Sequence, residues 1–384
     1  MFKSLSEEKV ITRISYTAPP DDFYATLRTR INEYLSSHHL QQQDDPGMYL
    51  KTFVQLGLWA GTYACMLSDY FHGWALLGWQ LLFHFSMFLM SVGIAHDGSH
   101  GAYSKKPWLN KLTYRVFDLI GINSHMWEYN HNLSHHYVPN IPLYDSAIDS
   151  FVLFRFHPRS AWHSFHRYQH WYIFLLYAFS TLFKIFILDF YSFSRKRIGM
   201  IAVNKPGWKD IAYLLFTKAV VIGYTLIIPL LVIHEPAWQI VAGFIAGNFL
   251  MGITLGIVFQ VTHLSDHTVF AEPDATGQVQ HSYPEHILKT TADFCADNKV
   301  ITWISGGLNL HVAHHLFPKI SQQHLPAITK IVKHTAAEYG LVYKEYPTVL
   351  AALRSHLRLL KRLGSRENFT AGDWPLEHYP VGLN

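Results

Sequence analysis

Residues 74–94 read WALLGWQLLFHFSMFLMSVGI, and after Ala95 the chain continues with HDGSH at residues 96–100. The first stretch has no Asp, Glu, Lys or Arg and is about as long as the 20 residues that a membrane-spanning helix needs. The second stretch places His96 and His100 four residues apart, which puts both imidazoles on one face of a helix. We therefore predict a membrane helix that carries two possible metal ligands at one end.

The composition agrees with a membrane protein. Of the 384 residues, 49% are apolar and only 15% are charged, whereas about 25% charged residues is the average for globular proteins. The net charge of +4 comes without a basic stripe interleaved with aromatic residues, so we expect no nucleic-acid partner. The two cysteines, Cys65 and Cys295, are far apart, which excludes a thiolate-held metal cluster and argues against a disulfide framework.

Three further apolar runs cover residues 53–71, 211–233 and 237–261. Together with 74–94 they predict two helical hairpins, whose tips contain neither Lys nor Arg. The basic residues lie in the segments between the hairpins, which the positive-inside rule places in the cytosol.

The run at 171–191 is also apolar, but it contains Lys184 and Asp189. If it crossed the membrane, the last part of the chain would lie on the opposite side from HDGSH. We therefore predict an interfacial helix there.

The predicted fold class is an all-α membrane protein with four transmembrane helices, an interfacial helix and a cytosolic helical cap that carries a di-metal site. Helical spacing of apolar residues predicts an amphipathic helix at 22–37, and helical patterns recur at 323–339 and 348–363. The N-terminal residues have no signal-peptide h-region, so we expect both termini in the cytosol. The predicted segments are a cytosolic N-terminal segment (1–50), transmembrane hairpin 1 (51–95), cytosolic histidine boxes 1 and 2 (96–169), the interfacial helix and connector (170–210), transmembrane hairpin 2 (211–262), and the cytosolic cap with box 3 (263–384).

Two more histidine boxes follow HDGSH. HNLSHH contains His131, His135 and His136, and HVAHH contains His311, His314 and His315. Histidines three or four apart share a helical face, whereas the adjacent pairs point about 100° apart, so that one helix can reach two metals. Eight imidazoles without thiolates suit iron, copper or zinc. Lone histidines such as His84 and His163 are more often hydrogen-bonded polar groups than ligands.

The order of these motifs resembles the membrane fatty acid desaturases, in the branch with front-end acyl-CoA and acyl-lipid enzymes. The resemblance covers about residues 53–341 and includes GGLNLHVAHHLFP (306–318), NIPLYDSAID (140–149), FQVTH (259–263) and TTADF (290–294). Front-end enzymes often have Gln at the position of His311, so the position of the double bond is not carried over. Fused relatives also have a cytochrome b5 domain with an HPGG motif, which this sequence lacks.

The resemblance implies two iron ions, with O2 as co-substrate, that remove two hydrogens from an acyl chain. It implies nine ligands, the eight box histidines and His263. In the stearoyl-CoA type an Asn stands where this chain has Phe259, and Gln260 is a weak substitute. Asp97 and Asp145 either accept hydrogen bonds from ligand rings or cap helices, and His125 is either a neighbour of the ligands or unrelated.

The acyl chain could be linked to CoA, to acyl carrier protein or to a lipid. Electrons would come from a separate donor, such as ferredoxin or cytochrome b5 with its reductase, and the protein would lie in a bacterial inner membrane or the ER membrane. A related hydroxylase or acetylenase would use the same boxes. A histidine-rich metal transporter is the alternative from another class, but it would place ionisable groups along a path through the membrane, and the boxes here follow the helix ends.

Overall fold

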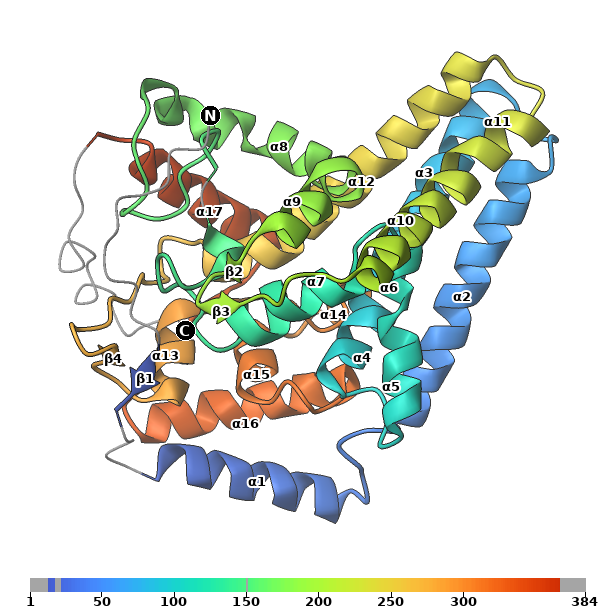
Figure 1. The fold of residues 1–384 in the computed structure, drawn as a ribbon. Coiled ribbons are helices and arrows are strands. Elements are labelled where there is room, and N and C mark those ends of the chain that lie inside the picture. Colours follow the sequence, from blue (N-terminus) through green and yellow to red (C-terminus); the bar gives the residue numbers. More distant parts are fainter. Residues whose placement is uncertain (1–12, 18–21, 150, 367–384) are drawn as a thin grey trace.

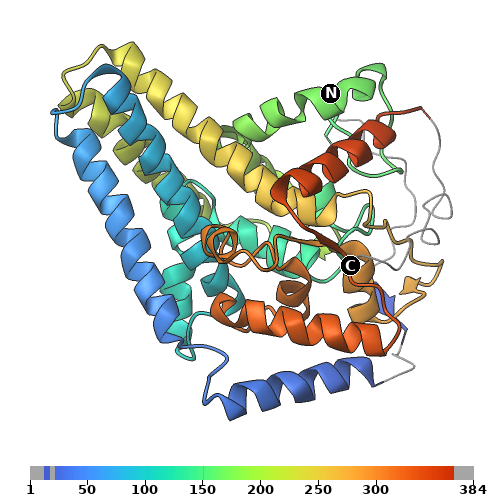
Figure 2. The ribbon, with the colours of Figure 1, turned by 180° about the vertical axis from the view of Figure 1, so that it is seen from behind.

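The computed structural model describes residues 13–17, 22–149 and 151–366, and these fold mainly into helices (Figure 1). Residues 1–12 and 367–384, predicted to be cytosolic, lie outside this description. The longest helices form one arm of the molecule, and the shorter helices gather at the other end (Figures 1 and 2). The long elements are α2 (Pro46–Leu67), α3 (Gly73–Met90), α10 (Trp208–Ile222), α11 (Ile228–Val232) and α12 (Ala237–His263).

In the described residues, four continuous helical segments are long and apolar enough to cross a membrane. They are Gly73–His100, Ser164–Ser194, Trp208–Val232 and Ala237–His263. Three of them cover predicted spans, so the all-α membrane class is confirmed and the chain is an integral membrane protein. The predicted span at 53–71 forms most of α2, which packs against α3, but α2 is not one of the four. The fourth is the segment predicted to be interfacial.

That fourth segment consists of a 3₁₀ turn (Ser164–Tyr168), α8 (Gln169–Phe183), a π-helical turn (Lys184–Leu188) and α9 (Asp189–Ser194). α8 packs against α12 but crosses it at a large angle instead of lying parallel with it (Figures 1 and 2). Length and apolarity alone would let this segment span a membrane. If α12 crosses the membrane, a helix that crosses α12 at a large angle would lie along the membrane surface, as an interfacial helix does.

A buried ion pair fixes this segment to α10. Lys218 Nζ lies 2.6 Å from a carboxylate oxygen of Asp189, which also accepts a hydrogen bond of 2.9 Å from the backbone N–H of Asn123. Lys218 is only 5% exposed. The ammonium group of Lys218 therefore does not extend to the membrane surface, as lysines near the ends of membrane helices often do, because a carboxylate from another helix binds it inside the protein.

The short helices form the other end of the molecule. The predicted amphipathic helix is α1 (Phe23–Ser37). Its apolar residues at helical spacing are buried against α16 (Leu325–Glu338), and these are Phe23, Leu27, Ile31 and Leu35. The other helices are α4 (His96–His100), α5 (Pro107–Tyr114), α6 (Val116–Leu119), α7 (Ser124–Trp127), α13 (Tyr283–Thr290), α14 (Lys299–Ile304), α15 (His311–Leu316) and α17 (Val349–Leu363). Two two-stranded pairs join distant segments: β1 (Ser15–Tyr16) with β4 (Gln278–Val279), and β5 (Asp293–Phe294) with β6 (Glu345–Tyr346). A third pair, β2 (Arg197–Ile198) with β3 (Ile201–Ala202), is a local hairpin.

Candidate metal centre

The first histidine box is the end of a long apolar helix. α3 continues through a π-helical turn (Ser91–Ala95) into α4, so His96 and His100 lie on a rigid extension of the apolar segment. Gly98 lets α5 pack closely, because a Cβ there would lie 2.6 Å from the backbone nitrogen of Tyr114. His96 and His100 share one side of α4, as their spacing predicts.

The second box lies on a π-helical segment, Glu128–His135. The N–H of His136 donates to the carbonyl of His131, five residues earlier, at 3.0 Å, as in a π-helix. The rings of His131 and His135 stack with centroids 5.5 Å apart, in keeping with their four-residue spacing. The Nε2 atom of His131 lies 3.1 Å from that of His136, whereas the Nε2 atom of His135 lies 3.1 Å from that of His263.

The third box forms α15, which begins directly after the GGLN sequence. Gly306 and Gly307 have φ values of +66° and +76°, a conformation that glycine adopts without strain. A carboxylate oxygen of Asp293 accepts the N–H of Val312 in the first turn at 2.9 Å. Asp293 belongs to the TTADF sequence, so that motif positions the third box.

His263 lies in the last turn of α12 and faces the second and third boxes. Its Nδ1–H donates to the carbonyl of Thr290 at 3.2 Å. Its Nε2 lies 3.1 Å from Nε2 of His135 and 3.0 Å from Nε2 of His315. The structure thus brings the ninth predicted histidine together with the other eight.

Within the described part of the chain, the nine histidines form two groups. In each group, the potential ligand atoms all lie within 4.8 Å of one another. The first group is His96, His100, His131, His136 and His314, and the second group is His135, His263, His311 and His315. The adjacent pairs in boxes two and three divide between the groups, as expected for helices that reach two metals.

Hydrogen bonds show why a cation fits the second group. His135 donates from Nδ1 to Asp145 at 3.0 Å, and His263 donates from Nδ1 to Thr290. In a neutral imidazole the other nitrogen then carries a bare lone pair. Two lone pairs at 3.1 Å repel each other unless a cation attracts both. His311 Nε2, whose ring donates from Nδ1 to Leu308, is likewise buried without a hydrogen-bond partner.

The spacing of the ring nitrogens suits ligands of a shared metal ion. Ring nitrogens at metal–nitrogen distances of about 2.1 Å lie about 3.0–3.4 Å apart. The Nε2 contacts of His131 with His96 and His136 are 3.0 and 3.1 Å, like those of His263. The donor set suits iron, copper or zinc.

Burial favours the neutral form of five box histidines. It lowers the pKa of His311 to about 3, and with the neighbouring imidazoles it holds the pKa values of His131, His136, His314 and His315 well below the ordinary range. Neutral imidazole is the form that binds metal.

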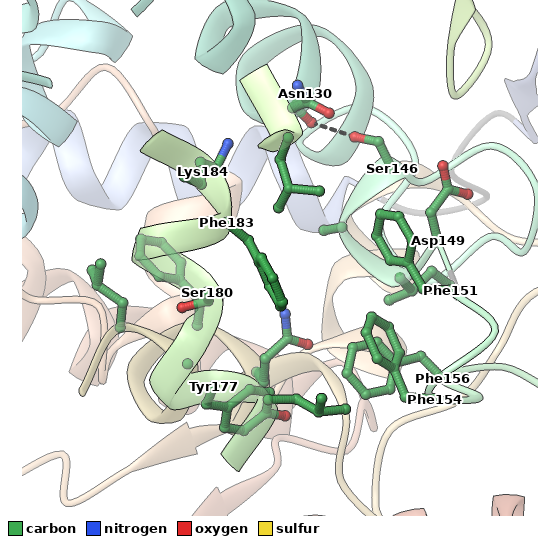
Figure 3. A pocket seen from close by; sticks show the side chains of 18 of the residues that line it. Asn130, Ser146, Asp149, Phe151, Phe154, Phe156, Tyr177, Ser180, Phe183 and Lys184 are labelled. Atoms are coloured by element: carbon green, nitrogen blue, oxygen red, sulfur yellow. Dashed lines mark hydrogen bonds between the residues drawn. The ribbon is translucent and has the colours of Figure 1, made fainter. Parts of the chain in front are cut away.

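A cavity of about 820 Å³, which we call the acyl cavity, reaches both groups. His131 of the first group and His135 and His263 of the second line its inner end. Figure 3 shows Tyr177, Phe183 and Lys184 on one helix and Phe151, Phe154 and Phe156 on the opposite wall. The size lies within the range of about 300–1,000 Å³ that is typical of ligand pockets, and the aromatic walls suit an apolar ligand.

The sequence profile of the fatty acid desaturase family matches residues 71–347, which contain all three boxes and His263. The chain belongs to the fatty acid desaturase family. It is thus a membrane oxidoreductase that forms double bonds in fatty acyl chains, as the sequence resemblance predicted.

Relatives of this desaturase align over most of their length. It is 33% identical to the sn-1 linoleoyl-lipid 6-desaturase of Arthrospira platensis, over 89% of this chain and 92% of that protein. It is 31% identical to the enzyme of the same name from Synechocystis, over 89% of this chain and 95% of that protein. It is also 31% identical to an acyl-lipid (8-3)-desaturase of Physcomitrium patens, over 91% of this chain and 73% of that protein.

The other predicted site residues, which are not metal ligands, have different surroundings. Asp145 accepts a hydrogen bond from His135, and Gln260 lines the acyl cavity. Asp97 accepts the backbone N–H of Gln322 at 3.1 Å, so it joins α4 to the segment after box three. His125 packs against the rings of Tyr129 and Phe193, away from both histidine groups.

Two lone histidines, His84 and His163, lie outside both histidine groups. His84 donates to the carbonyl of Gln80 and accepts from the side chain of Asn248, so it is hydrogen-bonded inside the helical arm. The backbone N–H of His163 donates to the ring of His166 in a short turn.

Our sequence predictions named His131, His135, His263 and Gln260 as site residues, but they assigned no residue to the apolar walls of the acyl cavity. One wall was detectable, because FVLFRF at 151–156 places three phenylalanines in a short segment between box two and an apolar run. The other wall depends on how α8 and α12 cross. At that crossing Gly256 is needed, since a Cβ there would lie 2.6 Å from the ring of Tyr177.

Proposed function

We propose that this desaturase introduces a double bond into a lipid-linked acyl chain, using O2 and two iron ions held by the nine histidines. The observation that carries the proposal is the acyl cavity, whose inner end is lined by members of both histidine groups. An acyl chain that enters this cavity brings a methylene pair next to both proposed metal positions.

Each histidine group would hold one iron. When bound, the two ions supply an oxidant made from O2 and two electrons that is strong enough to remove two hydrogens from neighbouring carbons. The protein positions the ligands through their second nitrogens: Asp145 orients His135, the carbonyl of Thr290 orients His263, and the carbonyl of Leu308 orients His311.

The remaining residues act on the substrate and on the surroundings of the metals. The aromatic walls would hold the acyl chain and exclude water. Gln260 offers an amide in the cavity wall close to His263, where it is placed to hydrogen-bond water near the metals. Asp97 would act indirectly, by holding the turn at Gln322 against α4.

We infer that the acyl chain is attached to a lipid and not to CoA or acyl carrier protein. The three relatives described above are named as enzymes that act on lipid-linked acyl chains. We further propose that the histidine groups and both termini face the cytosol and that α8 and α9 lie at the membrane surface. A separate electron donor, such as ferredoxin or cytochrome b5, would then reach the metals from the cytosol.

Mass spectrometry of the products tests this function. In a host without the activity, expression should yield membrane-lipid fatty acids that are lighter by two hydrogens, and His135→Ala should abolish them. A product heavier by one oxygen atom would instead indicate a hydroxylase. Purified protein should contain about two irons per chain. Metal uptake by cells without any change in their lipids would favour the transporter alternative.

A further inference from the structure

A second cavity, of about 290 Å³, lies between the first turns of α2, the helix α14 and the start of α16. We call it the lysine pocket. None of its lining residues lines the acyl cavity. Its lining residues are Lys51, Ala296, Asp297, Lys299, Thr302, Trp303, Gly307, Gln322, Gln323, Pro326 and Lys330.

The lysine pocket is positively charged. Three lysines and one aspartate line it, which gives a formal charge of 3 − 1 = +2. Among the described residues, no carboxylate lies within ion-pair distance of Lys51, Lys299 or Lys330, whereas most buried lysines are paired. Such a pocket is suited to an anion.

Lys51 is the residue that makes this a site and not a patch of surface charge. It is only 4% exposed, donates from Nζ to Gln322 Oε1 at 2.6 Å, and lies above the ring of Trp303 at 5.2 Å. An ammonium group has three donors, and the amide of Gln322 is a neutral acceptor. The donors that remain and the two exposed lysines at the rim can bind phosphate oxygens.

The surface beside the pocket is apolar. On α2, Leu50 and Phe53 are 66% and 73% exposed, and Val54 follows on the same helical face. On α14, Val300 next to Lys299 is 65% exposed. Large apolar side chains at this density on one surface indicate contact with lipid and not with water.

We propose that the lysine pocket binds the phosphate group of an anionic phospholipid, whose acyl chains lie along Leu50, Phe53 and Val54 of α2. Basic pockets at the cytosolic ends of membrane helices are suited to such head groups. This inference rests on the cytosolic side proposed above for the histidine groups and on the crossing of the membrane by α2 that the sequence predicts, but it does not depend on the desaturation chemistry.

Binding there would influence the first histidine box. Gln322 donates from its backbone N–H to Asp97, and from Nε2 to the carbonyl of Gly93 at 2.7 Å. Both acceptors belong to the continuous helix that carries His96 and His100. A phosphate that holds Lys51 and Gln322 in place therefore stabilises that helix against the turn after box three.

The test compares purified protein in nanodiscs of phosphatidylcholine alone and in nanodiscs that also contain phosphatidylglycerol. We expect phosphatidylglycerol to raise the unfolding temperature by about 5 °C, and native mass spectrometry to detect one retained phosphatidylglycerol per chain. Lys299→Gln combined with Lys330→Gln should lose both effects. Lys205→Gln combined with Lys209→Gln removes the same charge from two exposed lysines elsewhere and should keep both effects.

Three results would overturn the proposal. The first is equal stability in both kinds of nanodisc, or lipid retention that survives the Lys299 and Lys330 substitutions. The second is equal stabilisation of detergent-solubilised protein by inorganic phosphate, which would assign the pocket to a free anion. The third is a loss of donor-driven turnover by the Lys299 and Lys330 variant in pure phosphatidylcholine, which would assign the pocket to an acidic electron donor. Only the last readout needs an active enzyme. If the proposed function fails and the protein is inactive, the measurements of stability and of lipid retention still test the lysine pocket.

Discussion

His263 shows that a residue can join the histidine site through its place in the fold and not through a histidine box. It stands outside the three boxes, yet its Nδ1–H is bonded to the carbonyl of Thr290 and its Nε2 faces His135 and His315. Two other histidines in the same region, His267 and His281, do not belong to either group. The difference lies in the direction of the ring and not in the residue type.

Replacement of His263 by alanine should therefore remove a ligand of the second iron. We expect the variant to insert into the membrane normally but to lose activity at least about 100-fold, together with part of its iron. His267→Ala and His281→Ala are the controls and should keep both. Equal activity in all three variants would leave the eight box histidines as the complete ligand set.

Asp145 acts through His135. Its carboxylate accepts the ring N–H of His135 at 3.0 Å and the backbone N–H groups of Asn140 and Ala147 at 2.9 and 2.8 Å. Asp145→Asn should lower iron affinity or activity by about 10- to 100-fold, because an amide cannot supply the same negative charge to the ligand ring. Asp274→Asn, in an exposed loop, is the matched control. If iron binding in the Asp145 variant equals that of the control, Asp145 only caps the following turn.

At the scale of elements, the ion pair between Lys218 and Asp189 joins α10 to α9. Lys218→Met leaves the buried carboxylate of Asp189 with only the more distant Lys184, whose Nζ lies 3.7 Å away, and this should destabilise the protein by about 3 kcal/mol. The double variant Lys218→Met with Asp189→Asn removes both charges and should recover much of that loss. Thermal unfolding of the purified proteins measures both values. A double variant as unstable as the single one would show that the charges do not interact.

The segment Ser164–Ser194 is a second element whose placement, in this case relative to the membrane, can be tested. It is apolar enough to span, but a fifth crossing would separate α15 from α4, whose histidines lie in one group. In a protein without Cys65 and Cys295, cysteines introduced at Arg159 and Lys205 should both react with an impermeant reagent from the cytosolic side. Labelling from opposite sides would make the segment a true span.

At the scale of the whole molecule, the proposed iron centre would need a separate protein as its electron donor. Neither an HPGG motif nor a cysteine cluster occurs in the sequence. We therefore expect no turnover by the purified protein with NAD(P)H and O2 alone, and turnover after addition of ferredoxin or cytochrome b5 with its reductase. Oxygen consumption coupled to product analysis measures this, and the His135→Ala variant controls for oxygen use by the donor system itself. Product formation without a donor would show that the chain has its own electron entry.

Much of this protein is readable from the sequence, because its strongest signals are local. Apolar runs of membrane length predicted α3, the α10–α11 segment and α12, and helical spacing of apolar residues predicted α1, α16 and α17. The nine histidines that the structure brings together were all named from short motifs or from the family resemblance. Signals of this kind depend on neighbours a few residues apart, which sequence displays directly.

The tertiary structure decided what depends on partners far away in the chain. His131 and His136 join one histidine group and His135 joins the other, because the fold brings His96 and His314 beside the first two and His263 beside the third. Lys218 is buried because Asp189 meets it, and Lys51 lines a pocket with Gln322, which lies 271 residues away. Sequence spacing carries no information about such contacts, since the energy of a buried charge or ring is set by whichever group the fold brings to it.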